Sequence, residues 1–122
     1  MPHYLFVFLG GGLGSICRLG MGHLLAPLRL QYPWATFLSN VVSCFVLGVL
    51  VVLATKEKLG SQMAVFLMAG FCGGFSTFST FTNETFQMLL QGQYAKAAGY
   101  MLLSASVCLL SLFVGMKTAS QF

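Results

Sequence analysis

The feature that most constrains this chain is the near absence of charge along four long apolar stretches. Charged residues make up 7% of the chain and hydrophobic residues 57%, whereas about a quarter of an average soluble domain is charged. Two acidic and six basic side chains cannot give a soluble domain of this size a polar surface. The sequence therefore excludes an ordinary soluble enzyme, a disulfide-rich secreted domain and a disordered segment, and it predicts an integral membrane protein.

Each apolar stretch is long enough to cross a bilayer as an α-helix. A spanning helix takes about 20 apolar residues, so a chain of this length holds about four spans with short connections. The first stretch is not a signal peptide, because no basic residue precedes it and Arg18 interrupts it. We expect an all-α protein with a single transmembrane domain (residues 1–122) and spans at about 3–26, 34–54, 62–90 and 94–116.

The few basic residues bear on orientation and on partners. With four spans, Lys56, Lys58 and Lys117 share one side of the membrane with both termini, and Arg29 and Lys96 lie on the other. This is almost no bias, and Lys and Arg bias is what orients a membrane protein. Such a chain would insert both ways, and opposite copies would pair as an antiparallel, dual-topology homodimer. The basic residues form no cluster, so no nucleic-acid partner is expected.

The cysteines and histidines show no arrangement typical of a metal or redox site. No pair of cysteines has CxxC spacing and none lies beside a histidine, so neither a zinc site nor a redox motif is expected. We expect the cysteines to be small buried apolar residues. No pairing of a nucleophile with a base is visible, so the chain is not expected to be an enzyme. The four cysteines are Cys17, Cys44, Cys72 and Cys108.

The first span has one face of small residues that ends in a cation. Gly10, Gly14 and Arg18 follow each other at intervals of four, which is typical of close helix packing. An arginine within a span normally faces a water-filled cavity or a partner. The alternative is that Arg18 lies near the interface and extends its charge into water. In a cavity, its guanidinium would attract anions.

Polar side chains also form one stripe on the second span and one on the fourth. Thr36, Asn40 and Ser43 share a face of the second span. The fourth span repeats the pattern with Tyr100, Ser104 and Ser111. The Asn40 amide offers two hydrogen-bond donors to a buried group. Hydrogen bonds between helices are the structural alternative for both stripes.

The third segment is too polar in its middle to be one plain helix. Gly73 and Gly74 stand directly before a mostly polar run, and backbone broken at membrane depth is tolerated only where it is buried or lines a cavity. We therefore expect a break near Gly73–Ser79. Phe78 and Phe81 follow at helical spacing, and ring edges carry partial positive charge. Two rings presented edge-on would contact a dehydrated anion without trapping it; core packing is the alternative.

Donor groups outnumber acceptor-only groups in these polar positions. The single acid inside the predicted spans is Glu84. A pathway rich in donors and poor in carboxylates favours an anion over a cation. It also argues against proton-coupled transport, which usually needs buried titrating groups.

The stretch from Gly70 to Glu84 (GFCGGFSTFSTFTNE) resembles the signature of the Fluc/CrcB fluoride channel family. Two further stretches match the first- and second-helix motifs of that family, namely Gly10-Gly11-x-x-Gly14-Ser15-x-x-Arg18 and Thr36-x-x-x-Asn40. The resemblance implies four-helix subunits in antiparallel, dual-topology homodimers. It also implies two fluoride pores and a central sodium ion at the dimer interface.

The resemblance implies roles for individual residues. Phe78 and Phe81 would be the ring-edge fluoride contacts, and Asn40 the amide donor of the pore. The remaining pathway residues would be Thr36, Thr80, Tyr100 and Ser104 on the polar track, Arg18 in the vestibule and Glu84 near the pore.

The sodium site of the family uses main-chain carbonyls at the helix break, which match Gly73 and Ser76. Four carbonyl oxygens from two chains suit a hard cation. Ser76 stands where threonine is usual, which a main-chain ligand tolerates.

We therefore expect a passive fluoride channel in a bacterial inner membrane that lets fluoride leave the cytoplasm and so protects the cell. One alternative is a small dual-topology multidrug exporter, but such proteins rely on an acid in the first span, and His3–Ala26 contains none. The other is a structural subunit of a larger membrane complex, in which the polar stripes only join helices.

Overall fold

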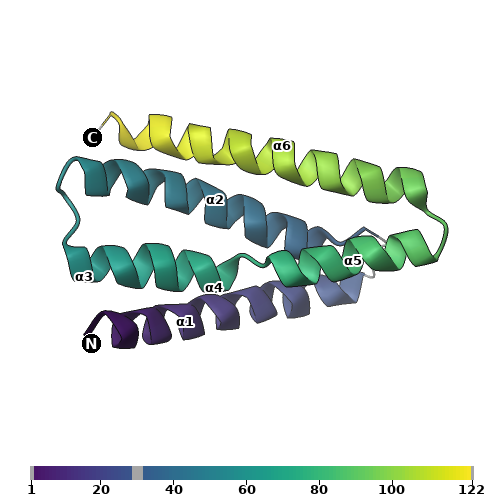
Figure 1. Ribbon diagram of the computed structural model, residues 1–122, viewed down its shortest axis with the longest axis horizontal. Helices are drawn as coiled ribbons and strands as arrows, with labels where there is room; N and C mark the ends of the chain where they lie inside the picture. The colour runs from purple at the N-terminus through teal and green to yellow at the C-terminus, as the bar shows by residue number, and fades with distance from the viewer. Residues whose placement is uncertain (1, 29–31, 122) are drawn as a thin grey trace.

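The computed structural model describes residues 2–28 and 32–121, and every regular element in these two ranges is helical (Figure 1). Four helical segments are long and apolar enough to cross a membrane, as expected from the sequence. Arg29 lies outside the described residues. The elements outside the third span are α1 (Pro2–Leu25), the short 3₁₀ turn η1 (Ala26–Leu28), α2 (Trp34–Thr55) and α6 (Tyr94–Ala119).

The third span is broken into two halves. Its first half is continuous and consists of α3 (Ser61–Ala64), the π-helical η2 (Val65–Cys72) and α4 (Gly73–Phe75); its second half is α5 (Phe78–Leu90). Ser76 and Thr77 between them are extended, with φ/ψ of −84°/158° and −152°/123°. The break lies within the range that the glycines and the polar run predict.

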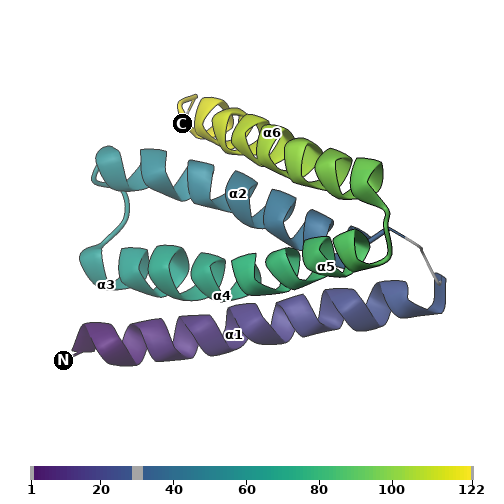
Figure 2. The same cartoon turned by 45° about the vertical axis from the view of Figure 1, so that its right-hand side comes forward.

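Both termini and the loop between α2 and α3 lie at one end of the bundle, and the turn between α5 and α6 lies at the other (Figures 1 and 2). The Lys56 ammonium donates to the Ser120 carbonyl at 3.0 Å, which joins the loop to the C-terminal end of α6. Lys96 lies in the first turn of α6 at the opposite end. This is the arrangement that four crossings require.

Glycines let the helices pack backbone against backbone. A Cβ at Gly14 would overlap the carbonyl oxygen of Phe71, so α1 lies directly against the first half of the third span. A Cβ at Gly48 would overlap the carbonyl of Leu112, which explains the close pairing of α2 with α6. Close approach through small residues is the usual packing of helices in lipid.

The outer surface of the bundle is apolar, and leucines and phenylalanines of every long helix point outward. A surface of this kind is stable against acyl chains and unstable in water. The protein is therefore a multi-pass membrane protein. Its small buried cluster lies where α2, α5 and α6 meet and consists of Phe37, Met88, Ala97 and Tyr100.

Candidate functional site at the helix break

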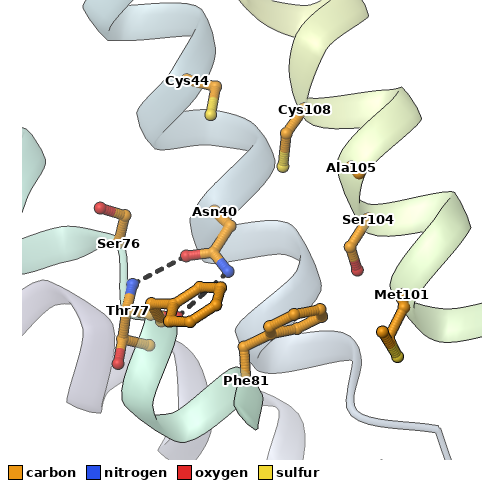
Figure 3. A pocket seen from close by; sticks show the side chains of 10 residues that line it. Asn40, Cys44, Ser76, Thr77, Phe81, Met101, Ser104, Ala105 and Cys108 are labelled. Carbon is orange, nitrogen blue, oxygen red and sulfur yellow. Dashed lines mark hydrogen bonds between the residues drawn. The ribbon is translucent and has the colours of Figure 1, made fainter. Parts of the chain in front are cut away.

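The side chain of Asn40 forms hydrogen bonds with the backbone of Thr77 at the break. The Thr77 N–H donates to Asn40 Oδ1 at 2.9 Å, and Asn40 Nδ2 donates to the Thr77 carbonyl at 3.4 Å (Figure 3). Backbone groups that are freed at membrane depth must find a partner. The amide on α2 therefore stabilises the extended conformation between α4 and α5.

The next helix begins with a cap from the same residue. The Thr77 hydroxyl accepts from the Thr80 N–H at 3.3 Å, which makes Thr77 the N-cap of α5. In an unbroken helix, the Thr80 N–H would bond the carbonyl of Ser76, and the Thr77 N–H would bond that of Gly73. Both donors are directed elsewhere, so these two carbonyls lose their helical partners.

Two neighbouring carbonyls, those of Gly74 and Cys72, are bonded by side chains. Arg18 Nε donates to the Gly74 carbonyl at 3.2 Å. The Cys72 carbonyl accepts from the Ser43 hydroxyl at 3.0 Å and from the Ser76 hydroxyl at 2.9 Å. Gly73 is exposed and Ser76 is half-buried. Main-chain oxygens without helical donors are ligands that a hard cation prefers, so the backbone here fits the predicted sodium site.

A cavity of about 490 Å³ lies beside the break (Figure 3). Asn40 from α2 and Ser104 from α6 line it on opposite sides. The Ser104 hydroxyl is buried, and within the described part of the chain no group bonds to it. Phe78 is 78% exposed and Phe81 is half-buried, and their ring centroids lie 5.7 Å apart in the cavity wall. The cavity thus combines hydrogen-bond donors with aromatic rings.

A second cavity, of about 230 Å³, adjoins the first because Thr77 lines both. It contains the opposite charges of Arg18 and Glu84, together with the polar side chains of Thr36 and Thr80. Glu84 also lines a third cavity of about 230 Å³, whose other walls are mainly the polar ends of α5 and α6. Polar residues therefore follow one another from the break to the end of the bundle.

Both oxygens of the Glu84 carboxylate accept hydrogen bonds from neighbouring helices. The Thr36 hydroxyl donates to Oε2 at 2.9 Å, and the Tyr100 hydroxyl donates to Oε1 at 2.9 Å. Tyr100 is fully buried, and its ring centroid lies 4.9 Å from that of Phe81. The carboxylate therefore joins α2, α5 and α6, and the two hydroxyl donors compensate part of its charge.

Eight of the nine pathway residues implied by the sequence line the first or the second cavity, and their contact with an ion stays a prediction. Tyr100 is fully buried and lines none of the three cavities; it is joined to them only through its bond to Glu84. Sequence reasoning missed Thr77, which lines two cavities and holds the break open. Threonine is a preferred N-cap residue, so its position before a run with helical spacing was the available signal. The expectation of buried cysteines is correct for Cys72 and wrong for Cys17, which is exposed. Cys44 and Cys108 are half-buried and line the first cavity.

Comparisons with known proteins find relatives along nearly the whole chain. Residues 5–116 match the family described as "CrcB-like protein, Camphor Resistance (CrcB)". A protein of Bacteroides fragilis named fluoride-specific ion channel FluC is 32% identical, over all of this chain and 99% of its own length. Proteins of the same name from Phocaeicola vulgatus and Thermus thermophilus are 34% and 36% identical. The aligned parts cover 94% and 96% of this chain, and 96% and 94% of the two relatives.

Proposed function

The chain belongs to the CrcB family. Because its relatives are named as fluoride-specific ion channels, we propose that it is one too. It conducts fluoride passively out of the cell and so protects the cell against fluoride toxicity. The multidrug exporter and the structural subunit are not favoured. The relatives are named as fluoride channels, and the similarity to this chain covers nearly their whole length.

The observation that carries this proposal is the convergence of Asn40, Ser104 and two phenylalanine rings on one cavity. A small anion gives up a strongly held hydration shell when it enters, and donors must replace it. The Ser104 hydroxyl has no partner in the described chain. The bond from Asn40 Nδ2 to Thr77, at 3.4 Å, is longer than an ordinary hydrogen bond. Both donors therefore have capacity for an anion, and the edges of Phe78 and Phe81 add weak positive potential.

The second cavity serves as the entrance to this site. The bond from Arg18 Nε to the Gly74 carbonyl fixes the guanidinium at the cavity wall. A fixed positive charge in a narrow, low-dielectric cleft raises the local concentration of anions. Glu84 lies in the same cavity, and its oxygens are occupied by Thr36 and Tyr100. Hydrogen-bonded in this way, the carboxylate has part of its charge compensated, which lowers its repulsion of an anion in the cavity.

The working unit is an antiparallel, dual-topology homodimer in the bacterial inner membrane. Near equality of basic residues on the two sides supports insertion in both directions. A sodium ion at the two-fold axis would be held by the main-chain carbonyls of Gly73 and Ser76 from each subunit. When bound, it supplies positive charge that offsets four converging carbonyl dipoles and so joins the broken spans of the two subunits.

Fluoride and chloride electrodes on proteoliposomes test the conduction directly. The native chain should release fluoride and retain chloride. Phe78→Ile and Phe81→Ile should each lose most fluoride release, because isoleucine has no ring edge. Phe86→Ile is the matched control, since Phe86 is exposed on the same helix and lines none of the three cavities described above. Equal passage of chloride, or unchanged fluoride release in both cavity variants, would contradict the proposal.

Topology and sodium are tested separately. A reporter fused to the C-terminus should appear on both sides of the membrane, and a reporter found on one side only would contradict dual topology. Exchange of sodium for a large organic cation should lower the melting temperature of the dimer. An unchanged melting temperature would remove the support for a structural sodium ion.

A further inference from the structure

Two cysteines that the proposed function does not use meet in the wall of the first cavity. Cys44 comes from α2 and Cys108 from α6, and both are half-buried cavity residues. Both side chains line the same cavity where α2 and α6 pack closely against each other. Figure 3 shows the two sulfur atoms between neighbouring helices, above Asn40 and Ser104. The cavity therefore contains a dithiol.

The packing of α2 against α6 holds the two thiols near each other. The Ser111 hydroxyl donates to the Val41 carbonyl at 2.7 Å, and Gly48 brings its backbone against the carbonyl of Leu112. On α6, both contacts follow Cys108. Each of these four residues lies about one helical turn from the cysteine on its own helix. Contacts this close to the sulfur atoms prevent the helices from moving apart, so the dithiol is preorganised.

We propose that Cys44 and Cys108 form a binding site for a soft monovalent metal cation of the Cu⁺ class. Thiolate sulfur is a preferred ligand of such ions, and a d¹⁰ monovalent cation accepts two ligands from opposite sides. In the described ranges no three histidine, cysteine or acidic side chains gather in one place, so the pair does not extend to the four-ligand set of a structural zinc. A soft cation therefore fits better than zinc.

Binding at this site is proton exchange and needs no redox partner. Each thiol releases its proton to water as its sulfur binds the metal. Two thiolates and one monovalent cation then carry one net negative charge. Cys108 lies one turn beyond Ser104 on α6, and both line the same cavity. The bound complex fills part of the cavity, and its charge repels an anion, so the metal closes the fluoride path. This consequence rests on the proposed function, whereas metal binding does not.

The test of binding uses silver nitrate in chloride-free buffer, because Ag⁺ has the same coordination preferences and does not change oxidation state. Equilibrium dialysis of the purified chain should give one tightly bound Ag⁺ per subunit. Cys44→Ser and Cys108→Ser should each weaken binding by at least about tenfold, the scale on which lost metal-site contacts act. Cys17→Ser is the matched control and should not change the tight site, because Cys17 is exposed and lines none of the cavities. Unchanged tight binding in both cavity variants would overturn the proposal.

If the serine variants do not fold, a measurement on the native chain still tests the dithiol site. Dibromobimane becomes fluorescent when two thiolates displace its two bromides, so it reports thiols that lie within reach of each other. Folded protein should give fluorescence from a Cys44–Cys108 crosslink, located by peptide mass, and prior addition of Ag⁺ should prevent it. A crosslink that forms equally in the presence of Ag⁺, or no crosslink at all, would contradict a dithiol site.

The same Ag⁺ titration on proteoliposomes tests the block. Fluoride release should fall to the background of protein-free liposomes in the native chain and in Cys17→Ser, and dithiothreitol should restore it. Each cavity variant is compared with its own rate without Ag⁺, and that rate should persist. Silver binding with undiminished fluoride release would contradict the proposed block of conduction but not the proposed metal site. A native chain that binds Ag⁺ but never conducts fluoride would instead contradict the proposed function.

Discussion

Replacement of Asn40 by alanine is the sharpest test of how the break in the third span is held. The Asn40 side chain makes two hydrogen bonds to the backbone of Thr77, at 2.9 and 3.4 Å, and joins α2 to the start of α5. Alanine removes both bonds and leaves the Thr77 N–H without its partner. That N–H would then return to the Gly73 carbonyl only if α4 and α5 became continuous, which would abolish the break.

The cost follows from the half-buried position of these groups, which places it in the lower part of the range for a buried donor. An unsatisfied buried donor costs about 1–3 kcal/mol, while hydrogen bonds between membrane helices average about 0.6 kcal/mol and reach about 1.7 kcal/mol. The 2.9 Å bond has ordinary length and the 3.4 Å bond is weak. We therefore expect Asn40→Ala to lower the free energy of unfolding by about 1–2 kcal/mol, a factor of about 5–30 in the folding equilibrium.

Two variants make the result specific. Asn83→Ala removes the same amide from an exposed position on α5 and should not change the stability. Asn40→Asp keeps an oxygen for the Thr77 N–H but loses the Nδ2 donor and adds negative charge. It should keep more stability than alanine while fluoride release is lost. Equilibrium unfolding in detergent and fluoride electrodes measure the two quantities. Stability of Asn40→Ala equal to that of Asn83→Ala, or fluoride release equal to that of the native chain, would refute the reasoning.

Two further predictions concern packing and the buried acid. Gly48→Ala should lower the free energy of unfolding by about 1–3 kcal/mol, because its Cβ would overlap the backbone of α6. Gly12→Ala, which has open space around the new Cβ, should be neutral; equal melting temperatures would contradict this account. Tyr100→Phe removes the donor to Glu84 Oε1 and should cost about 1.5–3 kcal/mol. Its control is Tyr94→Phe at an exposed position, and similar unfolding of the two variants would show that the bond contributes nothing.

Much of the fold and part of the site follow from local properties of the sequence. Apolar length alone predicts the four spans, because a bilayer excludes unpaired backbone and admits only helices of that length from such a chain. The glycine pair before a polar run predicts the break, which lies at Ser76 and Thr77. The spacing of four from Tyr100 also selects Ser104, which is buried and lines the first cavity.

The partner of each polar group depends on the tertiary structure. The sequence predicts a donor role for the Asn40 amide, yet its oxygen also accepts from the Thr77 N–H in the third span. That Cys44 and Cys108 line one cavity likewise depends on how α2 packs against α6. Helix formation in a membrane is set by the hydropathy of each segment, which is local. Hydrogen bonds and thiol pairs between helices depend on rotation and depth, which only the packing of all the spans determines.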